Sequence, residues 1–126
     1  PHPNVFEPTL RGEATARTEA FQAYESRNYE KASALLNELT KSGEDPGVMM
    51  LLGTSYLAMG KTREAKEMFS RLIAGHDELD VAGKWYLSLC YLKDNEEDKA
   101  VETLREIEGT SSPYAVRARS LLDDIN

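Results

Sequence analysis

The feature that most constrains the fold is a repeat: three segments of the chain align with one another without gaps, at offsets of 33 and 35 residues. These segments are 24–39, 57–72 and 92–107. One alanine takes the same place in all three, and two large apolar residues follow it at equal intervals. The aligned sets are Ala32, Ala65 and Ala100, then Leu36, Phe69 and Leu104, then Leu39, Leu72 and Ile107. Self-similarity at this period indicates an array of helical units.

Within each unit, the apolar residues recur at the spacing of a helix. The clearest set stands at i, i+3, i+4 and i+7 and consists of Met49, Leu52, Gly53 and Tyr56. Residues at these intervals share one face of an α-helix. Gly60 then supplies a left-handed turn, and Asn95 takes the matching place in the third unit. Asp45 is a suitable N-cap, and Pro46 a suitable first residue, for the second unit.

Small residues occupy equivalent places in the three units. On the first helix of each unit they are Ala20, Gly53 and Ser88. Glycine within a helix costs about 1 kcal/mol relative to alanine, so Gly53 needs a compensating role. We predict that it lets the two helices of its hairpin approach closely, with larger residues interlocking around the contact. The alternative is that a ligand approaches the bare backbone there.

Composition narrows the classes of function. A chain of 126 residues is most simply one domain. Its 22 acidic and 15 basic residues give a net charge of −7, which argues against general binding to nucleic acid or to anionic lipid. The single cysteine, Cys90, excludes an internal disulfide. The sequence has no run of about 18 apolar residues, so it predicts no membrane span or membrane contact of its own.

The first residues read PHPNVFEP and contain three prolines. We predict an extended lead over residues 1–12 rather than a helix. Because the chain has neither an initiator methionine nor a signal-peptide pattern, we expect it to be a fragment or processed form of a longer protein. The lead contains the apolar residues Val5 and Phe6, so it is a candidate occupant of any apolar groove that the repeats form.

The repeat pattern resembles that of the tetratricopeptide repeat family over residues 13–111. The middle unit carries the clearest match, with Leu52, Gly53, Tyr56, Gly60, Ala65, Phe69 and Leu72. The resemblance implies an all-α fold in which three hairpins, at about 13–44, 46–79 and 81–111, stack into a short right-handed solenoid. The segment 112–126 is expected to be a seventh, capping helix, because an uncapped array exposes its stacking face.

Three further stretches look like a membrane-anchored subset of the family found in the Bacteroides group. They read PNVFEPTLRGE, WYLSLCYLK and SPYAVRARSLLDDI. In that subset a transmembrane helix precedes the repeats, and the repeats face the periplasm. The resemblance therefore implies a periplasmic location with a tether upstream of Pro1, while a cytoplasmic location stays open as the alternative.

Residues that could carry chemistry are few, and each has a structural explanation. His76 lies among acidic residues in the connector at 74–80, which we interpret as a solvated loop with helix-capping acids rather than a metal site. The acidic run at 94–98 suits a solvated turn before a helix. Cys90 sits among apolar residues, as a buried hydrophobe does. Without a catalytic or phosphate-binding motif, the sequence predicts neither enzyme activity nor a cofactor nor a metal.

In the tetratricopeptide repeat family, the first helix of each hairpin lines a concave groove, and its inward stripe contacts peptides. By resemblance, that stripe here consists of Arg17, Phe21, Tyr24, Met50, Thr54, Leu57, Trp85, Leu89 and Leu92. Chaperone-binding members of the family use a lysine and asparagine clamp for a terminal carboxylate. This chain has other residues at those places, namely Phe21, Leu51, Ala82 and Tyr86. The alternative is that the stripe is partly core, because neighbouring first helices touch.

The sequence thus predicts a non-catalytic scaffold that binds a peptide or protein segment in an apolar concave groove. The alternative is a homo-oligomerisation module of an envelope-anchored protein, in which the groove or the ends of the solenoid join copies of the chain. Neither reading involves nucleic acid.

Overall fold

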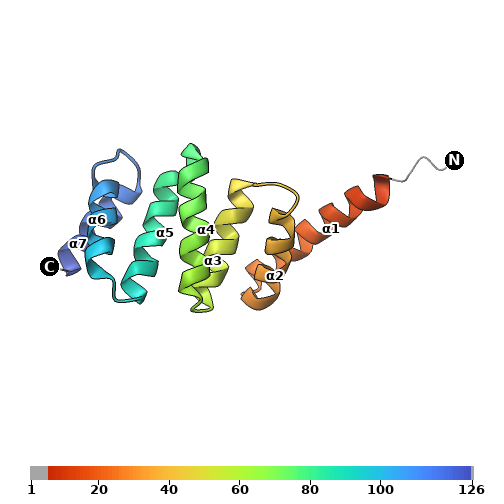
Figure 1. Ribbon diagram of the computed structural model, residues 1–126, viewed down its shortest axis with the longest axis horizontal. Coiled ribbons are helices and arrows are strands. Elements are labelled where there is room, and N and C mark those ends of the chain that lie inside the picture. The colour runs from red at the N-terminus through yellow and green to blue at the C-terminus, as the bar shows by residue number, and fades with distance from the viewer. Residues whose placement is uncertain (1–5, 126) are drawn as a thin grey trace.

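The computed structural model describes residues 6–125, with side chains for residues 15–76 and 78–125. The described residues form seven α-helices and one short 3-10 helix, without a strand. The elements are α1 (Phe6–Glu25), α2 (Tyr29–Thr40), α3 (Pro46–Ala58), α4 (Thr62–Gly75), η1 (Asp77–Leu79), α5 (Asp80–Lys93), α6 (Glu97–Glu108) and α7 (Tyr114–Ile125). The helices stand in a single row, with α1 and α7 at opposite ends (Figure 1). The predicted all-α hairpin array is confirmed.

The helices form two layers. Each hairpin pairs an odd-numbered helix with the next even-numbered one, and each hairpin packs on its neighbour through α2 and α3, α4 and α5, or α6 and α7. In addition, α5 contacts both α3 and α7 directly, whereas α2, α4 and α6 make no comparable contact with one another within the described residues. Because α3, α5 and α7 contact one another beyond their hairpin partners, they form the inner layer of the stack, together with α1, whose Tyr24 is hydrogen-bonded to Thr54 on α3.

The turns inside the three hairpins share one geometry. Arg27, Gly60 and Asn95 all have positive φ, at 63°, 78° and 61°. The residue after each of them donates its backbone N–H over 2.8 Å to the carbonyl five residues earlier. This is the arrangement in which a left-handed residue ends a helix. The predicted left-handed turns at Gly60 and Asn95 are confirmed, and Arg27 adopts the same conformation without being glycine.

The helix starting at Pro46 is capped as predicted. The Asp45 carboxylate accepts hydrogen bonds from the backbone N–H groups of Gly47, at 2.9 Å, and Val48, at 3.4 Å. Pro46 is the first helical residue, where its missing N–H costs nothing. Asp45 therefore fixes the start of the second unit.

The core confirms the packing role predicted for Gly53. A Cβ at this position would lie 2.6 Å from Cε1 of Phe69, and Phe69 is fully buried. The phenyl ring thus fills the space that a side chain would need. The buried residues form two clusters: the larger runs from α1 to α5, and the smaller joins α6 to α7.

The N-terminus differs from the sequence-based expectation. An extended lead was expected over residues 1–12, but α1 begins at Phe6 and is 20 residues long, so residues 6–12 are helical. Pro8 is compatible with this start, because the first turn of a helix has N–H groups without intrahelical partners. Val5 lies outside the described residues. The first turns of α1 extend past α2 (Figure 1). The hypothesis that the lead occupies a groove assumed an extended segment, and residues 6–12 are helical instead.

The other end of the chain follows the expectation with a small shift, since α7 begins at Tyr114 rather than at residue 112. None of the helices in the described part of the chain is both long enough and apolar enough to cross a membrane.

Candidate functional site

The nine residues of the predicted stripe lie on α1, α3 and α5, which belong to the inner layer. We refer to these nine residues as the inner stripe. None of them is fully buried: Arg17 is exposed, and the other eight are half-buried. A half-buried apolar side chain has one side against the core and the other open to solvent. The inner stripe therefore lies partly against the core and partly open to solvent.

Polar contacts fix the stripe where α1 meets α3. The Tyr24 hydroxyl and Thr54 Oγ1 are 2.9 Å apart and hydrogen-bonded. The Arg17 guanidinium lies over the Phe21 ring, 5.8 Å from its centroid. It also forms an ion pair with Asp45, whose Oδ2 is 3.2 Å from Nη2. At this end of the inner layer, polar and charged groups already have partners.

Trp85 lies at the contact between α5 and α7. Its ring is tilted against that of Tyr114, with centroids 6.0 Å apart. It packs against the smaller core cluster, while Met50 and Leu57 of the same stripe pack against the larger one. Trp85 therefore supports the seventh helix as well as lining the inner layer.

Leu89 and Leu92 are the stripe residues least tied to the core. Both are half-buried, yet neither packs against either cluster of buried residues. They stand on successive turns of α5, on the face that carries Trp85. Apolar atoms that the fold leaves partly open gain free energy when another molecule covers them. These two leucines therefore contribute apolar surface of the inner stripe that the core does not cover.

Three residues of α5 and α7 that make aromatic or cation–π contacts were absent from the predicted stripe: Tyr86, Tyr114 and Arg117. Tyr86 stacks on Phe69, with ring centroids 5.6 Å apart. Arg117 lies over the Tyr114 ring, 5.5 Å from its centroid. The repeat alignment could have drawn attention to Tyr86. It aligns with Leu51, and each of the two residues directly follows a member of the predicted stripe, Trp85 or Met50. No repeat signal marked Tyr114 or Arg117, because α7 was assigned only the role of a cap.

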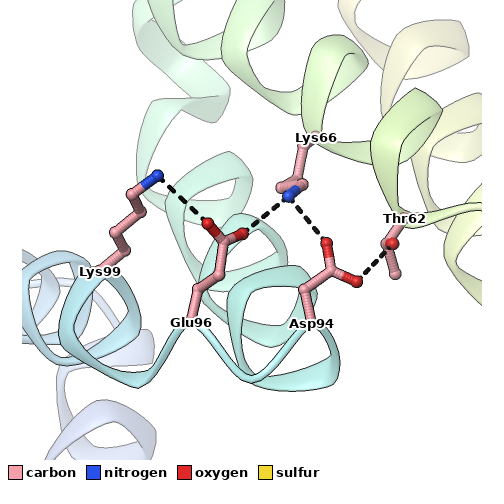
Figure 2. Close-up of polar contacts among 5 residues, drawn as sticks. All are labelled: Thr62, Lys66, Asp94, Glu96 and Lys99. Atoms are coloured by element: carbon pink, nitrogen blue, oxygen red, sulfur yellow. Dashed lines mark hydrogen bonds and ion pairs between the residues drawn. The ribbon is translucent and has the colours of Figure 1, made fainter.

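A network of ion pairs joins the second and third hairpins (Figure 2). Lys66 on α4 binds Asp94 at 2.7 Å and Glu96 at 2.8 Å, both in the turn between α5 and α6. Thr62 donates to Asp94 over 2.6 Å, and Lys99 pairs with Glu96 at 3.1 Å. The hydrogen bonds from Lys66 are the main cause that lowers the pKa of both carboxyl groups.

This network corrects the expectation of a merely solvated acidic turn at 94–98. Two of its carboxylates bind a lysine on the preceding hairpin, while Glu97 and Asp98 are exposed in the first turn of α6. The correction has a simple physical cause. The stacking of hairpins brings the turn of one unit beside the second helix of the previous unit, and a single sequence does not display that proximity.

The other reactive groups are held in structural contacts. His76 Nε2 lies 3.4 Å from a Glu44 carboxylate oxygen, and Arg71 binds the other oxygen at 2.7 Å. The hydrogen bond from Arg71 is the main cause that lowers the pKa of Glu44. Burial raises the pKa of the Cys90 thiol to about 11, so the group stays protonated at neutral pH. Among the described residues, no group of three or more His, Cys, Asp or Glu could hold a metal ion.

A depression of about 400 Å³ lies on α4. Its lining residues are Arg63, Lys66, Glu67, Ser70 and Arg71. Because all of them come from one helix, and because Lys66 and Arg71 are already in ion pairs, we regard it as an open surface feature rather than a site.

Comparison with known proteins agrees with the fold. A family model of the tetratricopeptide repeat matches residues 50–116, which is more than half of the chain. The chain therefore belongs to the tetratricopeptide repeat family. The match begins within α3 and continues through α4, α5 and α6 to the start of α7. A search of curated proteins finds no significant match.

Solved structures with the same fold include SycD, the type III secretion translocator chaperone of Yersinia enterocolitica. SycD in complex with a peptide of the translocator YopD aligns with a TM-score of 0.77 at 24% identity, covering 94% of this chain and 92% of that one. Another SycD structure aligns with a TM-score of 0.76 at 22% identity, covering 89% and 88%. At this level of identity, the likeness establishes the fold alone.

Proposed function

We propose that this chain is a non-catalytic interaction scaffold whose inner stripe binds an extended segment of a partner protein. The observation that carries the proposal is that eight of the nine inner-stripe residues on α1, α3 and α5, most of them apolar, are only half-buried. Apolar side chains that the fold leaves partly open gain free energy when another molecule covers them. The fold supports the same reading, since SycD has been solved with a peptide of YopD.

Leu89 and Leu92 provide the sharpest test of this proposal. They are half-buried but outside both core clusters, so replacing one of them by a charged residue should leave the fold intact. The matched control is Val116, an apolar residue on α7 that is 74% exposed. Both Leu89→Glu and Val116→Glu place a new carboxylate on the surface, but only the first places it on the inner stripe.

The experiment uses a library of random twelve-residue segments, displayed between fixed flanking sequences and selected on the immobilised wild-type protein. Segments recovered from wild type should lose at least about tenfold in affinity for Leu89→Glu, because a buried unpaired charge is costly. They should bind Val116→Glu as they bind wild type. Circular dichroism verifies that both variants stay helical. Equal binding to wild type and Leu89→Glu, or failure to recover any segment, contradicts the proposal.

The alternative function, self-assembly through the same surface, predicts a different result. Light scattering over a concentration series should then detect a dimer or larger species that Leu89→Glu dissociates. A strictly monomeric protein that still selects peptides excludes this alternative.

The envelope location implied by the resemblance to the Bacteroides group stays a prediction. Cell fractionation of the natural full-length protein provides the measurement. Recovery with membranes, together with digestion of the repeats by a protease added to the periplasm, supports the tethered periplasmic reading. A cytoplasmic soluble fraction contradicts it.

A further inference from the structure

The two ends of the inner layer differ in how their arginines are partnered. At the α1 end, Arg17 stacks on Phe21 and is neutralised by Asp45 at 3.2 Å. At the α7 end, Arg117 stacks on Tyr114 in the same manner. None of the ion pairs within the described residues involves Arg117. The same is expected from the sequence, because the residues three and four positions away on α7 carry no carboxylate.

The tyrosine hydroxyl groups at the two ends of the inner layer also differ in whether they have a hydrogen-bond partner. The Tyr24 hydroxyl is bound to Thr54, whereas in the described part of the chain neither Tyr86 nor Tyr114 makes a side-chain hydrogen bond. Burial is the main cause that raises the pKa of Tyr86; Tyr114 and then Tyr24 raise it further, and Arg117 lowers it. Tyr86 directly follows Trp85, whose ring contacts that of Tyr114 between α5 and α7.

We propose, building on the function proposed above, that the α7 end of the inner layer recognises an aspartate or glutamate side chain of the bound segment. Arg117 is the residue that pairs with the carboxylate, and the hydroxyls of Tyr86 and Tyr114 are further donors beside it. The apolar stripe, with Leu89 and Leu92, covers the apolar part of the same segment. The partner is therefore an extended, mainly apolar stretch with an acidic residue toward the α7 end.

The chemistry favours a carboxylate for three reasons. An arginine guanidinium matches a carboxylate with two parallel hydrogen bonds. The contact of Arg117 with the Tyr114 ring, 5.5 Å from its centroid, restricts the side chain before the ligand arrives, so less conformational freedom is lost on binding. No existing ion pair of Arg117 has to break, in contrast to Arg17, where an incoming carboxylate would compete with Asp45.

We expect Arg117 to make a moderate contribution to the affinity for the bound segment. Arg117 is exposed, so solvent screens part of the attraction. A charge-assisted hydrogen bond at a half-open surface should change affinity roughly five- to tenfold. An effect of this size is measurable as a preference in a selection and as a difference between matched peptides.

The test extends the display selection to Arg117→Gln and Arg117→Glu. The flanked segments have no free C-terminus, so any enriched carboxylate comes from a side chain. Wild type should enrich an acidic residue at one end of an apolar motif, Arg117→Gln should lose this enrichment, and Arg117→Glu should enrich lysine or arginine instead. The control is Arg119→Gln on the same helix, because Arg119 is already paired with Glu108 at 3.4 Å; it should leave the preference unchanged.

Matched synthetic peptides then give the size of the effect. Replacing the selected glutamate by glutamine should weaken binding to wild type roughly five- to tenfold and leave binding to Arg117→Gln nearly unchanged. Selected segments that depend on Leu89 but show no acidic preference, or an acidic preference that survives Arg117→Gln, overturn this inference while leaving the proposed function standing. If no segment depends on Leu89, both the proposed function and this inference fall.

Discussion

Single residues decide how closely the helices of each hairpin approach. Gly53 is the clearest example, because the ring of Phe69 occupies the position that any side chain would take. Arg27 is the opposite case, since it holds a left-handed turn with a side chain that disfavours it. Gly53 therefore suits its position, whereas Arg27 does not. We expect substitution of Gly53 to destabilise the protein and substitution of Arg27 by glycine to stabilise it.

Gly53→Ala should destabilise the protein by up to about 2 kcal/mol. Alanine improves helix propensity by up to about 1 kcal/mol, but forcing a methyl group against a packed ring costs roughly 1–3 kcal/mol, so the steric effect wins. Urea denaturation provides the measurement. Gly75→Ala is the control, because its Cβ would meet only a glutamate oxygen at 3.9 Å. Equal stability of wild type and Gly53→Ala contradicts the assigned role of the glycine.

Arg27→Gly should stabilise the protein by up to about 1 kcal/mol. The left-handed conformation costs an ordinary residue roughly 1–2 kcal/mol, and glycine avoids this cost but loses more conformational freedom on folding. Asn95→Gly tests the same turn in the third hairpin and should gain less, because asparagine tolerates positive φ. Thermal denaturation of the two variants should rank them in this order, and the reverse order is evidence against strain at Arg27.

At the scale of elements, the hairpins are joined by contacts between units as well as within them. The turn between α5 and α6 presents Asp94 and Glu96 to Lys66 on α4 (Figure 2). Lys66 is 25% exposed, whereas Lys99, which binds the same Glu96 from within α6, is 64% exposed. The ion pairs of the less exposed lysine, Lys66, connect two hairpins, whereas that of Lys99 lies within one. The pairs of Lys66 therefore help to fix the position of α4 relative to the turn that follows α5.

Lys66→Gln should weaken the protein more than Lys99→Gln does, because it removes both inter-hairpin ion pairs. The effect should also depend on pH. The folded-state pKa values of Asp94 and Glu96 lie below their ordinary values of 3.8 and 4.5. Their pairing therefore stabilises the fold above pH 4.5 and is lost as the pH falls through the lower folded values.

Urea denaturation at pH 7 and at pH 3.5 measures this dependence. The difference in stability between wild type and Lys66→Gln should be largest at pH 7 and should shrink at pH 3.5. A difference that stays constant between the two pH values means that Lys66 acts through packing on Tyr91, whose ring centroid lies 5.7 Å from its Nζ, rather than through the carboxylates.

At the scale of the whole molecule, α7 closes the array and also extends its inner layer. Ala118 and Leu122 are buried against α6, while Tyr114 contacts Trp85 on α5. The stacking face of the last hairpin is thereby covered, as solenoid proteins require. The same helix carries Arg117, which lies over the ring of Tyr114. One face of α7 thus caps the array, and another carries the arginine that we propose to bind an acidic residue of the partner.

Leu122→Ala should destabilise the protein by roughly 2–3 kcal/mol, as expected for truncation of a buried leucine. It should also loosen α7 and increase the quenching of Trp85 fluorescence by acrylamide. Val116→Ala on the same helix, at a site that is 74% exposed, should change stability by less than about 0.5 kcal/mol and leave quenching unchanged. Unaltered quenching in Leu122→Ala means that Trp85 does not depend on the docking of α7.

The sequence by itself determined the hairpins of this protein, because their signals are local. Apolar spacing, the cap at Asp45 and the left-handed turns at Gly60 and Asn95 each depend on residues within a few positions of one another. The period of the repeat then predicted stacking, and the small residue at Gly53 predicted the close contact with the following helix. These features follow from chain geometry that every helical unit shares.

The tertiary structure decided what lies between units. The ion pair of Lys66 with Asp94 in the next turn and the contact of Trp85 with Tyr114 join residues that are far apart in the sequence, and no repeat signal relates α7 to α5. It also corrected residues 6–12, where prolines suggested an extended chain but a helix begins. Side chains on different units meet only once the angle between hairpins is set, and that angle depends on the packing of whole helix faces rather than on any local pattern.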